Sequence, residues 1–443
     1  MKNKILILLT FSTLFLSAQE KTSFSLQEAV DFALKNSYAI QNALNDVEFA
    51  EKKVWETTSI GLPQIDASVD YQNFLKQQVQ LIPSEFFGGN PGEYAEVTFG
   101  TKQNVNAQIT LSQLIFDGSY IIGLQSVKTY IKISESAKEK TEFSIKQAVV
   151  NAYANVLLVE ETISILEKNK SILDKNLYET SKIVENGFGE EQDIEQLQLT
   201  LSAIINNLNK VNRYKITSYK LLNISLGIEV DTPINLTEKL EDLLLKNLDL
   251  GLVQTTFDIK NHVDYKIAEI NKTSKELLVK FEKSKALPTL KAFVNYGTVA
   301  YDEQFKFLSG NQKWFGSSLL GVSLNIPIFS SLQRSSRTQQ AKINLEIADR
   351  ELTETEQKLK IQIQDARTDY QFAIDNYQNS LENLNLAERI EKKENIKFFE
   401  GLSSSFDLLN AQTQLYNKQQ KYLESIQYLI NSKTTLETAL NIK

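Results

Sequence analysis

Residues 62–71 read LPQIDASVDY and residues 287–296 read LPTLKAFVNY, so one pattern occurs twice in the chain. In both copies a Leu-Pro pair precedes a run in which apolar and polar residues alternate. Such alternation is typical of a β-strand with one apolar and one polar face. A second alternating run follows each copy after a loop. The sequence therefore predicts four amphipathic strands, at about 64–72, 104–113, 289–297 and 317–326.

The apolar faces of these strands allow two surroundings. In a soluble sheet they would pack on a helix or a second sheet, whereas in an outer-membrane barrel they face lipid and the polar faces line water. Four strands cannot close a membrane barrel alone, because the edge strands would leave backbone groups unpaired in hydrocarbon. Three copies would give twelve strands, a number that leaves an aqueous bore. In that arrangement lipid would contact Val69, Ile109, Val294 and Val322, and the bore would be lined by Ser68, Gln108, Asn295 and Ser323.

The remainder of the chain is predicted to be mainly α-helical, with two very long helices. Only 6 prolines and 16 glycines occur in 443 residues, and neither occurs in residues 124–186 or 328–400. As continuous helices these runs would be roughly 95 and 110 Å long, which is typical of coiled coils or of a helical tube. Apolar residues of segment 363–384 recur every three or four positions, the spacing of a narrow coiled-coil seam.

The strand pattern belongs to an internal repeat. Gly187, followed by Asp193, corresponds to Gly401, followed by Asp407, and Leu226-Gly227-Ile228 corresponds to Leu440-Asn441-Ile442. Each half is predicted as helix, strand, loop, strand, long helix, turn and helix. We therefore predict a first structural repeat at 19–228, with a tip near 187, and a second at 229–443, with a tip near 401.

The first 18 residues are predicted to be a secretory signal peptide. Lys2 and Lys4 precede a short apolar run, and Leu16-Ser17-Ala18 is a small-residue cleavage pattern. The run is too short for a membrane span, which needs about 20 apolar residues. No later segment is predicted to be a transmembrane helix, so the pattern indicates an exported protein of the bacterial envelope.

Aromatic residues are frequent in the two predicted loops, 73–104 and 297–316. Aromatic residues beside amphipathic strands are typical of the interfacial girdle of a membrane barrel. Ordinary packing within the loops is the alternative interpretation.

The composition excludes several classes of function. The chain has no cysteine, which excludes a disulfide scaffold, a thiol nucleophile and cysteine-ligated zinc or iron–sulfur centres. His262 is the one histidine and is predicted to lie on the surface of a polar helical stretch near Asp264. The acids at 190–195 are best interpreted as a solvated helix start, because acids favour helix N-termini. The net charge of −7 argues against nucleic-acid binding. We predict a protein that is not an enzyme and needs no cofactor or metal.

Four features of the sequence resemble the TolC-like outer-membrane efflux channel family. Residues 25–36, SLQEAVDFALKN, resemble the family's opening helix, and Ser25 with Glu28 forms a predicted capping box. A Leu-Pro pair precedes the first strand of each half, and Pro327-Ile328-Phe329 lies where the last strand leads into a long helix. The segment 400–412 resembles the family's turn-and-helix signature. The resemblance covers essentially the whole chain after residue 18.

The resemblance implies an architecture and a set of partners. Members are homotrimers whose strands form a 12-stranded β-barrel in the outer membrane and whose helices form a long α-helical barrel in the periplasm. A periplasmic adaptor (membrane fusion protein) binds the tip and links it to an inner-membrane transporter. The expected function is therefore the passive outer-membrane exit duct of a tripartite efflux or type I secretion system. The alternative is a soluble periplasmic coiled-coil adaptor or spacer, against which the duplicated amphipathic strands argue.

The resemblance also assigns site residues in this chain. The adaptor-docking tips correspond to Gly187, Phe188, Gly401 and Leu402, and the strand–helix junction to Pro327. The channel constriction corresponds to Asp407, with Asp193 in the equivalent place of the first half. Two positions at which family members hold a second aspartate or a locking arginine are Asn410 and Ser403 here. Neither the exported substrate nor the pump class, proton-driven or ATP-driven, follows from the sequence.

Overall fold

The structure, a computed structural model, describes residues 23–442, and the predicted signal peptide lies outside them. The chain divides into two compact units. The helical unit consists of residues up to 45, 136–266 and 355 onward, and the sheet unit of residues 46–135 and 267–354. Each unit takes segments from both halves of the chain. The compact units therefore differ from the predicted repeats, whose boundary at residues 228 and 229 stays a prediction.

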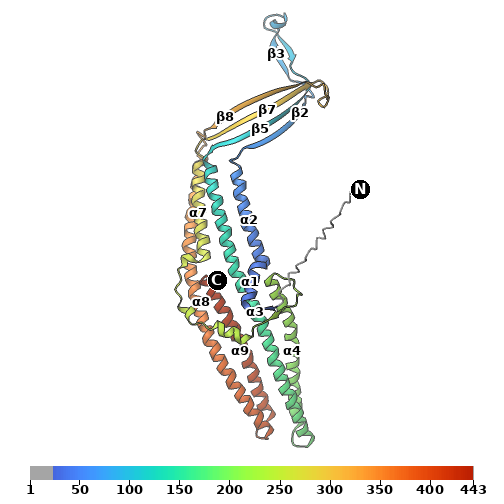
Figure 1. The fold of residues 1–443 in the computed structure, drawn as a ribbon, viewed down its shortest axis with the longest axis vertical. Coiled ribbons are helices and arrows are strands. Elements are labelled where there is room, and N and C mark those ends of the chain that lie inside the picture. The colour runs from blue at the N-terminus through green and yellow to red at the C-terminus, as the bar shows by residue number, and fades with distance from the viewer. Residues whose placement is uncertain (1–22, 443) are drawn as a thin grey trace, which may run out of the picture. The chain divides into compact units, whose positions relative to one another are not determined.

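The elements follow one another in a similar order in both halves (Figure 1). The first half contains β1 (Ser23–Phe24), α1 (Leu26–Asn36), α2 (Tyr38–Ser59), β2 (Gln64–Asn73), β5 (Gln103–Asp117), α3 (Gly118–Glu185) and α4 (Glu191–Leu226). The second contains α7 (Val263–Ser284), β7 (Thr289–Asp302), β8 (Trp314–Asn325), α8 (Gln333–Phe399) and α9 (Ser405–Ala439). Between the halves lie β6 (Asn235–Leu236), α5 (Leu240–Asn247) and α6 (Gly251–Gln254). The two long helices have 68 and 67 residues.

The sheet unit contains one antiparallel sheet with the strand order β2-β5-β7-β8. Figure 1 shows these four strands side by side. Strands β7 and β8 extend further than predicted, which shortens the loop between them to residues 303–313. A β-bulge between Leu114 and Phe116 interrupts the register of β5 just before α3 begins. Bulges bend a strand and increase its twist, which suits the end of a sheet.

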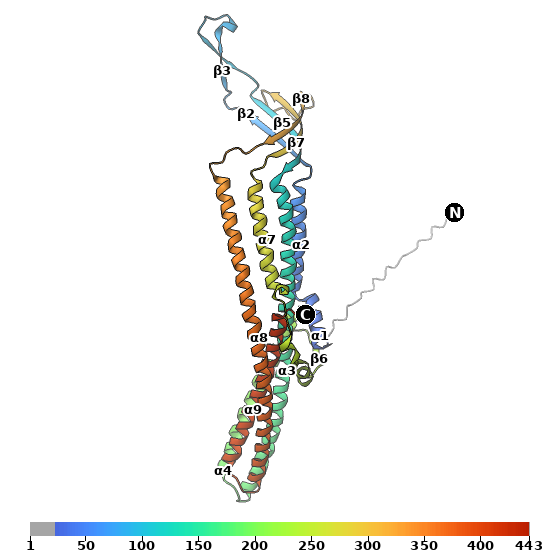
Figure 2. The same cartoon turned by 90° about the vertical axis from the view of Figure 1, so that its left-hand side faces the viewer.

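The predicted loop 73–104 is wrong in part, because it contains a hairpin of its own. Strands β3 (Val79–Pro83) and β4 (Tyr94–Thr98) pair antiparallel, and a 3₁₀ turn, Ser84–Phe87, lies between them. Figures 1 and 2 show this hairpin beyond the end of the four-stranded sheet. Both Phe86 and Phe87 are exposed on it.

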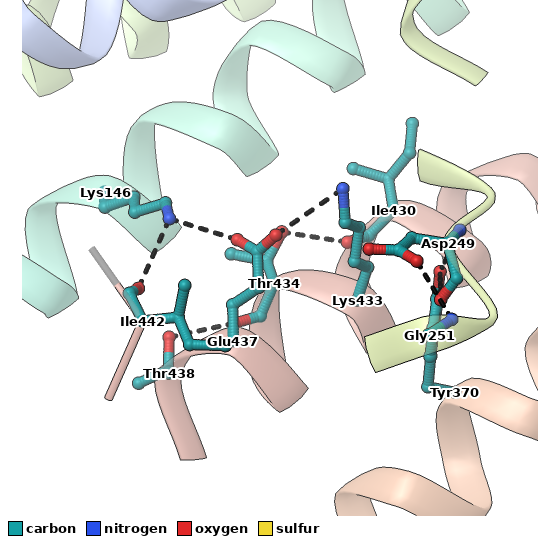
Figure 3. A network of polar contacts seen from close by, with 10 residues as sticks. All are labelled: Lys146, Asp249, Gly251, Tyr370, Ile430, Lys433, Thr434, Glu437, Thr438 and Ile442. Atoms are coloured by element: carbon teal, nitrogen blue, oxygen red, sulfur yellow. Dashed lines mark hydrogen bonds and ion pairs between the residues drawn. The ribbon is translucent and has the colours of Figure 1, made fainter. Parts of the chain in front are cut away.

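The core of the helical unit forms where α1, α3, α8, α9 and the segment after α4 meet. Tyr153 of α3 is fully buried, and its hydroxyl donates to the carbonyl oxygen of Phe24 at 3.0 Å. Tyr370 of α8 is also fully buried, and its hydroxyl accepts from the Asp249 N–H at 3.0 Å (Figure 3). These tyrosines can lie in an apolar core because each hydroxyl has a backbone partner.

Two details of the helical unit bear on predictions. The capping box of α1 is confirmed: the Ser25 Oγ accepts from the Glu28 N–H, and the Glu28 carboxylate accepts from the Ser25 N–H at 2.9 Å. The prediction of a surface position for His262 is wrong, because this side chain is only 3% exposed. Its sequence neighbours at the start of α7 are polar, but the ring is buried and makes an edge-on contact with the ring of Phe257.

Among the described residues, α3 alone is long and apolar enough to cross a membrane by length and composition. Its Val149, Tyr153 and Leu157 are buried in the core of the helical unit. These side chains therefore have protein partners.

Candidate channel surfaces and helical tips

One face of the sheet is apolar and open. Directly paired residues point to the same face, as do residues two positions apart. The register pairs Ile109 with Tyr296 and Val294 with Leu320. It thereby brings together the four residues predicted to contact lipid, Val69, Ile109, Val294 and Val322. The side chains of Val69 and Val322 are 72% and 68% exposed, whereas Val105 and Ala300 at one end of this face are buried with Phe307 of the β7–β8 loop.

The opposite face is mostly polar. The register places there the four residues predicted to line the bore, Ser68, Gln108, Asn295 and Ser323. Phe293 and Leu319 are apolar exceptions on this face. The ring of Phe293 lies over Gly321, where an added Cβ would come within 2.4 Å of it. The ring of Phe293 can lie over residue 321 because this residue is a glycine and has no Cβ.

The two outer strands of the sheet, β2 and β8, each pair on one side only. Each carries a row of backbone N–H and C=O groups on the other side, over 10 residues of β2 and 12 of β8. Unpaired edges readily accept another strand, and in hydrocarbon they are not tolerated. The unpaired edges and the exposed apolar face thus both indicate that the sheet binds a partner.

The first helical tip joins α3 to α4 at Gly187. This glycine has φ +80, and its N–H donates to the Val184 carbonyl at 2.9 Å. The Phe188 N–H donates to the Ile183 carbonyl at 3.0 Å. This pair of bonds is the Schellman motif, in which glycine tolerates the left-handed conformation that ends a helix. The side chain of Phe188 is 86% exposed beyond the turn.

The second tip, between α8 and α9, repeats this geometry. Gly401 has φ +72, and the Leu402 N–H donates to the Lys397 carbonyl at 2.8 Å. Leu402 is 73% exposed, in the place of Phe188. Ser403 donates a hydrogen bond to the Glu394 carboxylate, which also pairs with Lys397 at 3.0 Å. Each tip therefore presents one apolar side chain on a fixed turn.

Asp407 and Asp193 occupy equivalent positions in the first turn of the helix after each tip. The Asp407 carboxylate accepts from the Ser404 Oγ at 2.6 Å and from the Ser404 N–H at 3.3 Å. These hydrogen bonds lower the pKa of Asp407. Asp193 accepts from the Glu190 N–H at 3.4 Å. Each aspartate thus binds its own turn, and the predicted ring of carboxylates, which concerns three copies, stays a prediction.

Pro327 lies between β8 and α8, in a junction that sequence reasoning resolved only in part. The guanidinium of Arg334 donates to the Pro327 carbonyl at 2.7 Å and to the Ile328 carbonyl at 3.2 Å. Ser331 and Leu332 take positive φ values of 47 and 65, which are unfavourable for residues with a side chain. The long helix therefore begins at Gln333, later than the absence of glycine and proline indicates. The role of Arg334 has no local sequence signal, because its partners are backbone carbonyls.

Apolar packing holds the helices of the α3–α4 hairpin together, and polar pairs join this hairpin to the α8–α9 hairpin. Leu166, Leu173, Leu197 and Ile204 form an apolar seam inside α3–α4. Between the hairpins there are three polar pairs, Asn169 with Gln419 at 2.8 Å, Asn176 with Asn395 at 3.3 Å, and Gln196 with Ser405 at 3.2 Å, and Tyr416 of α9 packs against the apolar seam. The sequence did not reveal these pairs, since buried Asn and Gln resemble solvated ones in a helical pattern.

The comparisons with known proteins agree with this geometry. The family described as "Outer membrane efflux protein" matches residues 260–441. No protein with a curated function matches the chain by sequence. Among solved structures, the chain is similar to CusC, at 16% identity and a TM-score of 0.72, with 94% of this chain and 92% of CusC covered.

Two further outer-membrane structures have the same fold. VceC from Vibrio cholerae is 15% identical, with a TM-score of 0.70 and coverage of 94% of this chain and 97% of VceC. The CmeC channel of Campylobacter jejuni is 19% identical, with a TM-score of 0.70 and coverage of 94% and 85%.

The fold is therefore that of outer-membrane channels: mainly helical, with a small sheet. Together with the family match, it confirms the resemblance to the TolC-like outer-membrane efflux channel family. The family consists of outer-membrane efflux proteins, so the expected location is confirmed at the level of the family. Of these structures, CusC and CmeC are described as channels.

Proposed function

We propose that this chain is one protomer of a trimeric exit duct in the outer membrane, serving a tripartite efflux or type I secretion system. Three sheets close into a 12-stranded barrel, and the long helices continue as a helical barrel in the periplasm. The duct is passive, catalyses no reaction and needs no cofactor. The energy for export comes from an inner-membrane transporter that acts through a periplasmic adaptor.

The observation that carries the proposal is the sheet. Its apolar face is exposed on each of the four strands, apart from the end that packs on Phe307, and both outer strands lack a second neighbour in the described chain. Pairing β8 of one copy with β2 of the next satisfies both edges and leaves one continuous apolar band for lipid. The directions agree, because each neighbouring pair in the order β2-β5-β7-β8 is antiparallel. In a soluble adaptor or spacer this apolar face would be exposed to water, which argues against that alternative.

Exposed apolar side chains on the helices support assembly of several copies. They occur on α4 and on α8, at Leu199, Ile216, Ile361 and Phe372. Isolated apolar side chains on a surface are ordinary, but these lie on long helices whose other faces already pack in the core of the chain. Contact between α4 of one copy and α8 of another would bury them in a helical barrel.

The tips are proposed to bind the adaptor. Phe188 and Leu402 stand out from rigid turns, and apolar side chains of this kind are suitable anchors for a helical hairpin of a partner. Three-fold symmetry would also bring three copies of Asp407, and three of Asp193, around one axis. Such rings would attract cations at the entrance.

Two measurements test this proposal. The mature chain should fractionate with the outer membrane and run as a detergent-stable trimer that forms channels in planar bilayers. In these channels Asp407→Asn should reduce cation selectivity without changing the trimer. A soluble periplasmic monomer would contradict the duct, whereas unaltered selectivity would contradict only the place of Asp407.

A further inference from the structure

The single histidine of the chain is the N-cap residue of α7. The Lys266 N–H donates to the His262 carbonyl at 3.0 Å, which is the first helical hydrogen bond of α7. The Asp264 N–H donates to the imidazole Nδ1 at 3.1 Å. An acceptor side chain at this position satisfies one of the free N–H groups of the helix start. Since Nδ1 accepts, the neutral ring carries its proton on Nε2.

This helix start is a node that ties three helices together within the helical unit. The next N–H, of Val263, donates to the Asn441 Oδ1 at 3.3 Å, just after α9. The ammonium of Lys140 in α3 pairs with the Asp264 carboxylate at 2.7 Å. These two side-chain contacts connect the first turn of α7 with the end of α9 and with α3, and the histidine cap lies within that turn.

The end of α9 is itself held to α3. The Lys146 ammonium donates to the Ile442 carbonyl at 3.4 Å and pairs with Glu437 at 3.1 Å (Figure 3). Asn441 keeps a positive φ of 54, so its side chain reaches Val263 from a fixed backbone. The contacts of Lys146 thus fix the end of α9 to α3, whereas the conformation of the first turn of α7 depends on the histidine cap.

The surroundings of the ring favour the neutral form. His262 is buried, and its Nε2 has no hydrogen-bond partner among the described residues. Burial lowers the pKa of His262, the nearby charge of Asp264 opposes this, and Lys140 and Lys266 add to the lowering. The ring of Phe257, 6.2 Å from the imidazole between centroids, carries no charge.

We propose that His262 is an acid-sensitive clamp on the first turn of α7: while neutral it keeps this turn folded in the conformation that meets α3 and the end of α9, and it releases the turn when protonated. A protonated Nδ1 is a donor and cannot accept from the Asp264 N–H. The positive charge would also stand at the N-terminus of α7, where the helix dipole disfavours cations. The clamp does not depend on the assembly of a channel.

The direction of the pH effect follows from linkage. The pKa of His262 in the folded chain lies below its ordinary value of 6.5. The stabilisation by the cap is therefore complete above about pH 6.5 and is lost as the pH falls through the folded pKa. The equilibrium constant for opening the first turn should rise about tenfold for each unit by which the pKa is lowered.

Hydrogen–deuterium exchange of the full mature protein between pH 7.5 and pH 5 tests the clamp. After correction for the intrinsic rate, the wild-type peptide that covers the first turn of α7 should lose protection as the pH falls. The variant His262→Asn keeps an acceptor at the N-cap but cannot titrate, so its protection should not change. Equal pH profiles for both proteins would overturn the proposal.

A second measurement remains decisive if the variant folds poorly. Since the chain has one histidine, ¹³C-labelled histidine gives a single titrating ring signal in the wild-type protein without a tag. Its midpoint should lie below 6.5 and coincide with the loss of protection, and Asp264→Asn should move it lower still. A midpoint at or above 6.5 would overturn the proposal.

Discussion

The helical unit and the sheet unit treat their apolar side chains in opposite ways. In the helical unit, residues such as Leu429 and Ile430 of α9 are completely buried. In the sheet, residues such as Leu320 and Val322 of β8 are mostly exposed, although their strand is equally apolar on one side. The helical unit therefore has a core within one chain, whereas the proposed duct leaves the apolar face of the sheet to lipid and its edges to neighbouring chains. The two regions should respond differently to the same change.

The same substitution in both regions should show the largest contrast. Leu429→Ala empties a fully buried site, which typically costs about 2–5 kcal/mol of unfolding free energy. Leu320→Ala, at a site that is 73% exposed, should cost less than about 0.5 kcal/mol in detergent. Urea unfolding followed by far-UV circular dichroism measures both. Equal losses would mean that β8 has a protein core that the described chain does not contain.

Arginine substitutions on the two faces of β8 test which face contacts the membrane. Val322→Arg places a charge on the apolar face and should cost about 2–4 kcal/mol near the middle of the bilayer. Ser323→Arg lies on the opposite face and should assemble normally while altering conductance. The measurement is the yield of trimer inserted into vesicles. If both variants lose assembly alike, the assignment of the two faces fails.

The tips should give a smaller, local effect. Ser404 caps α9 by accepting from the Asp407 N–H at 3.2 Å, so Ser404→Ala should cost about 1 kcal/mol of local helix stability. The matched change in the other tip, Glu190→Ala, should have little effect, because Glu190 binds Asp193 through its backbone N–H. Hydrogen exchange of the first turns of α9 and α4 compares them. A larger loss at α4 would contradict the assigned caps.

The smallest effect concerns pH at the second tip. Because the pKa of Asp407 is lowered from its ordinary 3.8, its stabilisation of the turn is complete above that pH and is lost as the pH falls below it. Wild-type protein should therefore lose exchange protection at the start of α9 in strong acid, and Asp407→Asn should show no such step. A loss of protection that begins near pH 6 in wild type would indicate the raised pKa of an acidic ring.

Regular patterns made most of the fold predictable. Alternation in LPQIDASVDY located β2, observed at Gln64–Asn73, and the matched positions Gly227 and Asn441 both have positive φ in the structure. Gly227 could not be another residue, because an added Cβ would come within 2.3 Å of the Asn36 carbonyl. Asn441 adopts the same conformation and uses its side chain.

The features that were missed depend on tertiary contacts. The β3–β4 hairpin follows no simple alternation, since Pro83 and a glycine-rich turn interrupt it. His262 resembled a surface residue because its neighbours are polar, and only the fold reveals that its ring is buried. The amide pairs between the helical hairpins join residues about 210 to 250 positions apart, so no local pattern could indicate them.

Cross-linking between β2 and β8 is the most direct test of whether neighbouring chains complete the sheet. The chain has no cysteine, so Ser68→Cys can be combined with Ser317→Cys or Ser323→Cys in an otherwise thiol-free protein. In one chain β5 and β7 separate these strands by about 14 Å, beyond the roughly 7 Å that a disulfide can span. If neighbouring chains pair through β2 and β8, covalent dimers and trimers should appear on a non-reducing gel of outer-membrane fractions. Double variants that stay monomeric across both pairs, in protein that is folded and inserted, would contradict this pairing.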